Sequence, residues 1–266
     1  MMLEHRVIVN RINKKFQRDY ISEGGSLFRG LSFLSRKKSK FFDVLKNISF
    51  KLKPEEVLGI IGKNGSGKST LLRVMADIYE IDSGNIDMNG GVVYLTGFAH
   101  GLKTKLTMRE NIYLIGLLRG LGRTEIDSKF EEIVEFSGLR DYLDTKVYQF
   151  SSGMINRLSF SITIHCIFYK NPEILLIDEA FVSGDIGFSK KGLKKMRALL
   201  KRGSSVVLVS HNLNLIQKYC DKVIWLENGE IKMKGQPRKI IKAYKKKYDN
   251  AIESKKYLEK KKNKRM

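Results

Sequence analysis

The segment from Gly62 to Ser69 constrains the fold of this chain more than any other feature. It reads Gly-Lys-Asn-Gly-Ser-Gly-Lys-Ser and matches the phosphate-binding pattern G-x-x-x-x-G-K-[ST]. An apolar run at 57–61 precedes it and a helical stripe at 69–78 follows it, which is the context that the pattern requires. The sequence therefore predicts a nucleotide-binding loop between a buried parallel strand and a helix.

The residues of this loop have distinct expected roles. Glycines let the backbone approach a phosphate closely, and the helix N-terminus adds partial positive charge. We expect Lys68 to bind the β- and γ-phosphates as a cation and Ser69 to offer its hydroxyl to Mg²⁺. The residues expected to hold the nucleotide are Gly62, Lys63, Asn64, Gly65, Ser66, Gly67, Lys68, Ser69 and Thr70.

Two carboxylates follow an apolar run at 174–177 and complete the expected reaction centre. At the end of a buried strand, Asp178 can hold Mg²⁺ through water. Glu179 is then placed to polarise the water that attacks the γ-phosphate. The alternative is that Asp178 and Glu179 merely cap the next helix.

Two further features can contact phosphate. Ser151, Ser152 and Gly153 stand at a predicted helix start, where free backbone N–H groups bind anions. Because residues 62–69 already hold one nucleotide, we expect this helix end to bind the nucleotide of a partner subunit. His211 directly follows the predicted strand 205–209 and can contact the γ-phosphate, although a lone histidine can also be structural.

Strands that alternate with helices predict a parallel α/β sheet. The runs 41–52 and 84–97 are compatible with a strand pair and a small hairpin, and Asn228-Gly229 predicts a closing hairpin. Thr107 and Glu110 predict a capping box. The predicted helices span 69–78, 107–121, 126–137, 151–168, 189–202 and 212–219.

These motifs, in this order, resemble the ATP-binding cassette (ABC) family of transporter nucleotide-binding subunits over residues 4–236. The resemblance implies a P-loop NTPase of the ABC ATPase type, with a mainly parallel sheet core, an antiparallel β subdomain and a helical subdomain. It identifies 62–69 as Walker A, 174–179 as Walker B with catalytic Glu179, and 150–154 as the signature. It also implies that Asp185 belongs to the D-loop and that His211 is the switch histidine.

Two departures from the family pattern point to one subfamily. No glutamine follows the strand near residue 95, and the signature reads Phe-Ser-Ser-Gly-Met. Both departures are similar to the ATPases that export capsule, O-antigen and teichoic acid, and the basic insertion at 22–40 looks like the long entry segment of the O-antigen and teichoic acid members. Some of these carry a C-terminal sugar-binding domain, which we do not expect in a chain that ends at residue 266.

The resemblance also implies partners. We expect a homodimer closing around two ATP molecules, and a separate membrane-spanning permease that docks near 96–105. The alternatives are a soluble nucleic-acid- or ribosome-associated ABC ATPase, which a single cassette disfavours, and an exporter ATPase for another cargo. An aromatic residue often stacks on adenine near the start of these domains, and Phe41 and Phe42 are the candidates.

Charge is concentrated at the two ends of the chain. Residues 1–53 carry 13 Lys/Arg against 4 acids and residues 238–266 carry 13 against 3, whereas residues 54–237 carry 24 against 21. Basic ends suit an anionic membrane surface or nucleic acid, or they are simply well solvated. Nucleic acid is the less expected partner, because the central part is nearly neutral.

We expect an ABC ATPase domain at 1–237, with its helical subdomain at about 100–168, and a basic C-terminal helix and tail at 238–266. In that helix Ile241, Tyr244, Tyr248 and Ile252 form an apolar stripe expected to dock on the cassette or its dimer mate. No apolar run reaches the ~20 residues of a membrane span, and no signal peptide is evident. We therefore expect a peripheral protein on the cytoplasmic side of the inner membrane. Cys166 and Cys220 are expected to be buried thiols.

Overall fold

The computed structural model describes residues 4–18, 40–96, 101–178, 194–195, 198 and 201–248. Glu179 and Asp185 lie outside these residues. So do residues 97–100, nearly all of the basic insertion, most of 189–202 and the tail from 249 onward, including Ile252. The expectations placed on these residues stay predictions.

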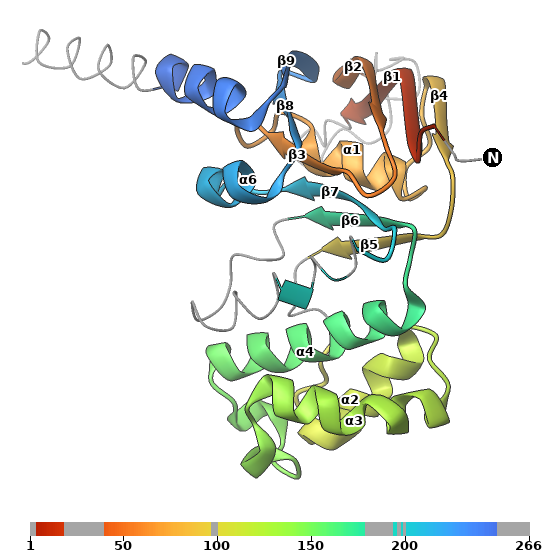
Figure 1. The fold of residues 1–266 in the computed structure, drawn as a ribbon, viewed down its shortest axis with the longest axis vertical. Coiled ribbons are helices and arrows are strands. Elements are labelled where there is room, and N and C mark those ends of the chain that lie inside the picture. Colours follow the sequence, from red (N-terminus) through yellow and green to blue (C-terminus); the bar gives the residue numbers. More distant parts are fainter. Residues whose placement is uncertain are drawn as a thin grey trace, which may run out of the picture.

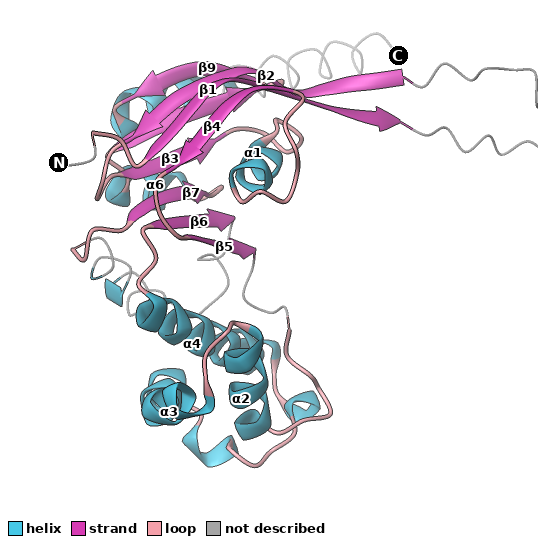
Figure 2. Ribbon diagram, turned by 90° about the vertical axis from the view of Figure 1, so that its right-hand side faces the viewer, coloured by secondary structure: helices cyan, strands magenta, loops and turns pink. Residues whose placement is uncertain are grey.

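The described strands form two sheets. The larger sheet has the order β5-β6-β7-β3-β8-β9, and all its strands are parallel except β9, which pairs antiparallel with β8. The smaller, antiparallel sheet has the order β2-β1-β4 (Figures 1 and 2). The strands are β1 (Val7–Arg18), β2 (Lys40–Leu52), β3 (Val57–Ile61), β4 (Ser83–Met88), β5 (Val92–Thr96), β6 (Ile174–Asp178), β7 (Ser205–Val209), β8 (Lys222–Glu227) and β9 (Glu230–Gly235).

Alternate residues of the central strands enter different cores, as the pleat requires. In β6, Leu175 and Ile177 pack with Phe160 of α4 (Ser152–Lys170). Ile174 and Leu176 instead join the core that contains the apolar face of α1 (Lys68–Met75) and residues of the smaller sheet. Both faces of the parallel sheet are therefore covered, which explains why its strands are continuously apolar.

A helical unit made of α2 (Met108–Leu118), α3 (Arg123–Ser137) and α4 has a core of its own. Thr107 and Glu110 form the predicted capping box at the start of α2. Fully buried Asn111 accepts from the Lys103 N–H at 2.7 Å and donates to the Lys103 carbonyl at 3.0 Å, so it fixes the chain before the helix. Figure 2 shows this unit below the sheet, with α4 nearest to it. The fold therefore has the α/β core, antiparallel β subdomain and helical subdomain that were expected.

Three local predictions were wrong. Residues 84–97 do not form a hairpin, because β4 pairs with β1 while β5 joins the other sheet beside β6. Residues 41–52 belong to one long strand that pairs with β1 rather than to a strand pair. The helix after the phosphate loop ends at Met75, and Ile78 is 54% exposed instead of continuing the apolar stripe.

Other local predictions are confirmed. Asn228 and Gly229, at φ 51° and 81°, form the turn between β8 and β9. Asn212 caps α6 (Leu213–Tyr219) by accepting from the Leu215 N–H at 3.0 Å. Both cysteines are buried free thiols, and burial raises the pKa of Cys166 to about 11 and that of Cys220 to about 12.

A C-terminal helix, described over residues 237–248, packs against the edge of the larger sheet. Ile240 and Ile241 are buried there, and Tyr244 packs edge-on against Trp225 with ring centroids 5.4 Å apart. The predicted stripe of Ile241, Tyr244 and Tyr248 thus docks on the cassette itself.

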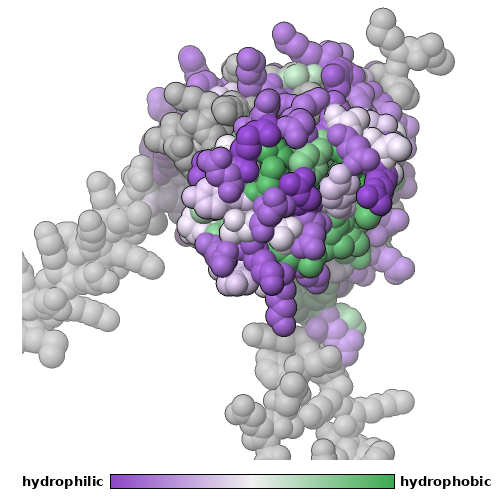
Figure 3. Space-filling view, turned by 90° about the horizontal axis from the view of Figure 1, so that it is seen from below, coloured by the Kyte–Doolittle hydropathy of each residue, from purple (hydrophilic) through white to green (hydrophobic). Residues whose placement is uncertain are grey.

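Within the described ranges, none of the helices combines the length and apolarity needed to cross a membrane. Seen from below, the helical unit presents hydrophobic residues surrounded by hydrophilic ones (Figure 3).

Candidate functional site: the phosphate loop and its surroundings

Loop 62–69 lies between β3 and α1, where several backbones meet. A Cβ on Gly62 would lie 2.2 Å from the carbonyl oxygen of Leu226. Gly67 has φ 103°, and a Cβ there would lie 2.8 Å from the Val44 oxygen. A Cβ on Gly65 would meet no atom within 4 Å, so the outer side of this residue is open. The loop is therefore packed on its inner side by β2 and β8 and open where a phosphate would enter.

Lys68 is the buried cation of this loop, with only 6% of the residue exposed. Its ammonium group donates to the Gly62 carbonyl at 3.0 Å and to the Lys63 carbonyl at 2.9 Å. These bonds hold the charge beneath the loop, where phosphate oxygens can reach it. Ser66 is also buried, Ser69 and Thr70 are half-buried, and Lys63, Asn64 and Gly65 are exposed.

Asp178 ends β6 at the same sheet edge as the loop, because β6, β7 and β3 are parallel neighbours. Its Oδ1 atom is buried and has no hydrogen-bond partner. An unpartnered carboxylate oxygen is costly to bury unless a ligand satisfies it. Carboxylate and hydroxyl oxygens are hard ligands suited to Mg²⁺. Asp178 and the Ser69 hydroxyl therefore fit the expected metal.

Tyr94 of β5 is a residue near this site that the sequence analysis did not assign. Its hydroxyl donates to Asp178 Oδ2 at 3.4 Å, which leaves Oδ1 as the unpartnered oxygen. Burial first, and then the charge of Asp178, raise the pKa of Tyr94 and keep its hydroxyl protonated. The sequence carries no local signal for this contact, because it depends on the pairing of β5 with β6 in the folded sheet.

Aromatic side chains line the outer side of the loop. A cavity of about 410 Å³ is lined by Phe16, Phe42, Val44 and loop residues from Asn64 to Thr70. Phe42 is paired with Phe16 across the strands, whereas Phe41 is paired with Gln17. Successive residues of a strand point to opposite faces, so Phe41 faces away from this cavity. Of the two candidates, Phe42 lines the cavity, and Phe16 joins it unexpectedly.

Of the signature residues, Ser151, Ser152 and Gly153 are exposed at the N-terminus of α4, whereas Phe150 is buried. Ser151 is the N-cap and accepts from the Met154 N–H at 3.3 Å, as its place at a helix start predicted. Ser152 and Gly153 open the helix. The helical unit that α4 belongs to lies below the sheet, away from β3 and α1, which flank loop 62–69 (Figures 1 and 2). One chain therefore does not bring 151–153 to its own phosphate loop.

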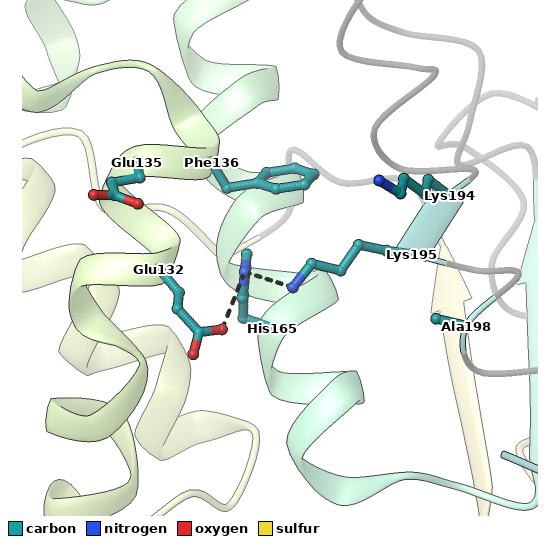
Figure 4. Close-up of a pocket in the computed structure, with 7 residues that line it drawn as sticks. All are labelled: Glu132, Glu135, Phe136, His165, Lys194, Lys195 and Ala198. Atoms are coloured by element: carbon teal, nitrogen blue, oxygen red, sulfur yellow. Dashed lines mark hydrogen bonds and ion pairs between the residues drawn. The ribbon is translucent and has the colours of Figure 1, made fainter.

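His211 is exposed just beyond the carboxyl end of β7, between the strands that carry Asp178 and the loop. A different histidine, His165 of α4, lies in a separate cavity of about 590 Å³ lined also by Glu132 and Lys195 (Figure 4). Its Nδ1 lies 2.7 Å from the Ser161 carbonyl and its Nε2 lies 3.1 Å from Lys195 Nζ. Burial lowers the pKa of His165 to about 4, so the neutral ring donates from Nδ1 and accepts at Nε2.

The chain matches known proteins over this whole region. The sequence model of the ABC transporter family matches residues 45–182, from β2 to just past β6. The Teichoic acids export ATP-binding protein TagH of Lactococcus lactis subsp. lactis is 39% identical over 88% of this chain and 49% of its own length. The O-antigen export system ATP-binding protein RfbB of Klebsiella pneumoniae is 37% identical over 78% of this chain and 83% of its own length.

The chain spans about half the length of the TagH relatives from Lactococcus lactis and Enterococcus faecalis. Among solved structures, the ATP-binding subunit of an ABC transporter aligns with a TM-score of 0.66 and 23% identity, covering 90% of this chain and 92% of its own. The sequence comparisons and the fold therefore agree. The chain belongs to the ABC transporter family.

Proposed function

We propose that the chain is the ATP-hydrolysing subunit of a transporter that exports a bacterial surface polysaccharide or its lipid-linked form. The observation that carries the proposal is loop 62–69, open outward and with the Lys68 cation held beneath it. The proposed cargo is supported by relatives that are named for teichoic acid export and O-antigen export.

The reaction is phosphoryl transfer from ATP to water, which yields ADP and phosphate. Lys68 and the N–H groups of the loop bind the β- and γ-phosphates and stabilise the charge that develops on them. Mg²⁺, held by Ser69 and Asp178, would neutralise charge on the same phosphates. Glu179 accepts a proton from the attacking water, and His211 contacts the γ-phosphate. Catalysis then depends on positioning and charge rather than on covalent chemistry.

A second copy completes the site in this proposal. Ser151, Ser152 and Gly153 expose the N-terminus of α4 at a distance from the loop of their own chain, so they are available to a partner's nucleotide. Asp185 would lie near the same interface. A solved ABC cassette with a TM-score of 0.66 to this chain is described as a dimer bound to ADP and Pi.

The remaining partners are a membrane-spanning permease and the cytoplasmic surface of the inner membrane, where the chain would be peripheral. We place the permease contact at Thr96–Lys105. Asn111 holds the backbone of Lys103, which lies within this segment, through two hydrogen bonds. Cysteine pairs between this segment and the cytoplasmic loops of the permease should crosslink, and crosslinks found only elsewhere on the cassette would contradict the placement.

The test of the proposed activity compares the wild-type chain with Lys68→Ala. We expect the wild type to bind a fluorescent ATP analogue and to hydrolyse ATP, and Lys68→Ala to lose hydrolysis and bind at least tenfold more weakly. Lys129→Ala, a lysine on the helical unit, is the matched control and should behave as wild type. Equal binding by the Lys68 variant would overturn the assignment of the loop.

The cargo is tested separately by complementation. The chain and its permease should restore surface polysaccharide in a strain that lacks an O-antigen or teichoic acid export ATPase. Restored drug resistance without restored polysaccharide would favour the alternative of another cargo.

A further inference from the structure

The C-terminal helix contacts the phosphate loop directly. The Nζ atom of Lys63, the second residue of the loop, lies 4.1 Å from the centroid of the Tyr248 ring. A lysine ammonium this close to an aromatic face forms a cation–π contact. Tyr248 and Lys63 line the same cavity of about 290 Å³, together with Asn64, Gly65 and Ser66. The last described turn of the helix is thus part of the surroundings of the loop.

Tyr248 is itself held on the far side of this contact. Its hydroxyl donates to Glu227 Oε1 at 2.7 Å, and Lys247 Nζ lies 2.5 Å from Glu227 Oε2. The Tyr248 ring also packs edge-on against Tyr244 and Trp225, with centroids 4.7 and 6.2 Å away. Burial and the Glu227 carboxylate raise the pKa of Tyr248, so the hydroxyl stays a donor. These contacts fix the ring with respect to the sheet.

The contact also leads to the functional cation. The Lys63 side chain lies against Tyr248, while the Lys63 carbonyl accepts from Lys68 Nζ at 2.9 Å. The turn next to Glu227 supports the loop as well, because the Gly229 N–H donates to the Ser66 carbonyl at 3.2 Å. Lys63 therefore contacts both Tyr248 and Lys68, so a change at Tyr248 can alter the position of Lys68 through this one residue.

We propose that Tyr248 is a positioning residue for nucleotide binding, which holds Lys63 so that the phosphate loop keeps its receiving shape. Docking of the C-terminal helix then sets the affinity of the loop for a nucleoside di- or triphosphate. The proposal rests on the proposed function, in which residues 62–69 bind ATP. It makes a segment beyond the last sheet strand part of the nucleotide site.

The test is a double-mutant cycle with a fluorescent ADP analogue as the probe. Tyr248→Ala and Lys63→Ala should each raise Kd about two- to fivefold, the effect expected of one cation–π contact. The double variant should bind no more weakly than Lys63→Ala alone, because Tyr248 acts only through Lys63. Tyr248→Phe keeps the ring and should bind close to wild type. Lys245→Ala, an exposed lysine of the same helix, is the matched control.

In steady-state hydrolysis the Tyr248→Ala variant should raise KM with little change in kcat, since the ring does not touch the reacting atoms. Melting temperatures within a few degrees of wild type would show that the variants fold. Unchanged Kd in Tyr248→Ala, or additive losses in the double variant, would overturn the proposal. If the wild type binds the probe and Lys68→Ala does not, the proposed function stands even when Tyr248 fails. If the wild type does not bind, both fail.

Discussion

The hydroxyl of Tyr94 donates to the carboxylate of Asp178 across the pair formed by β5 and β6. The bond orients one oxygen of Asp178 and leaves the other buried without a partner. In the proposed function Asp178 holds Mg²⁺, and a residue that orients a metal ligand affects the metal although it does not touch it.

Tyr94→Phe should therefore weaken the apparent affinity for Mg²⁺ in hydrolysis. We expect the Mg²⁺ concentration at half-maximal rate to rise about tenfold, the lower end of the range for lost partners of metal ligands, because the bond is long. Tyr113→Phe is the matched control, since it also loses a hydroxyl–carboxylate bond, to Asp127 at 2.6 Å, but in the helical unit. An unchanged Mg²⁺ dependence in Tyr94→Phe would show that Asp178 is oriented by other groups.

Glu179→Gln should keep ATP binding and slow hydrolysis by ~10²–10⁴, the range for loss of a general base. An ATP-bound dimer should accumulate and appear as a larger species in size-exclusion chromatography. Glu173→Gln at the opposite end of β6 is the control, because that carboxylate accepts from the Gly91 N–H at 2.8 Å. Normal turnover by Glu179→Gln would remove this residue from the catalytic role.

Phe42→Ala should weaken ATP binding more than Phe41→Ala does. Phe42 lines the cavity beside the loop and Phe41 points to the other face of β2, so only the former can stack on adenine. We expect a loss of about fivefold to tenfold, in line with one aromatic contact to a base. Comparing the Kd for ATP with that for inorganic triphosphate separates the contribution of the base from that of the phosphates. Equal losses for both ligands, or a larger loss in Phe41→Ala, would contradict this assignment.

His165 should make the fold sensitive to acid. Its pKa is about 4 in the folded chain against 6.5 for the free side chain, so between these values the unfolded chain binds a proton that the folded chain does not. Stability is retained above pH 6.5 and falls as the pH drops toward 4, by up to about 3 kcal/mol. The charged groups that face the ring are Lys129, Glu132 and Lys195.

Urea unfolding at pH 7 and pH 5 measures this loss. His165→Asn keeps a donor toward Ser161 but does not titrate, so its stability should fall less between the two pH values. The same decline in both proteins would place the acid sensitivity elsewhere.

The tail beyond Tyr248 should bind anionic membranes. Residues 249–266 contain seven Lys/Arg against three acids, and each basic residue near an anionic surface contributes ~1 kcal/mol. Truncation after Tyr248 should leave ATP hydrolysis intact and reduce co-sedimentation with anionic vesicles at 0.1 M salt. Binding of the full chain to the vesicles should weaken at 1 M salt, where the Debye length is ~3 Å. Equal binding by the two chains would refute a membrane role, and a preference for RNA at physiological salt would favour the nucleic-acid alternative.

The sequence alone determined the features that depend on neighbours along the chain. The pattern of 62–69 between an apolar run and a helical stripe is local, and so are the capping box at Thr107 and the turn at Asn228-Gly229. The apolar stripe at Ile241 and Tyr244 also followed from residue spacing, whereas its docking on the cassette rather than on a dimer mate did not. Such features are specified by backbone preferences and by apolar periodicity, both of which a single sequence displays.

Tertiary structure decided which strands and side chains meet. Residues 84–97 look like a hairpin, yet β4 and β5 enter different sheets, and no local preference distinguishes these pairings. The same holds for the choice of Phe42 over Phe41, which depends on the register with Phe16, and for the contact between Tyr94 and Asp178. Lys63 and Tyr248 are 185 positions apart and meet only because β8 and the C-terminal helix pack beside the loop. Pairing, register and packing are properties of the whole chain, since each is set by the apolar area that the complete fold buries.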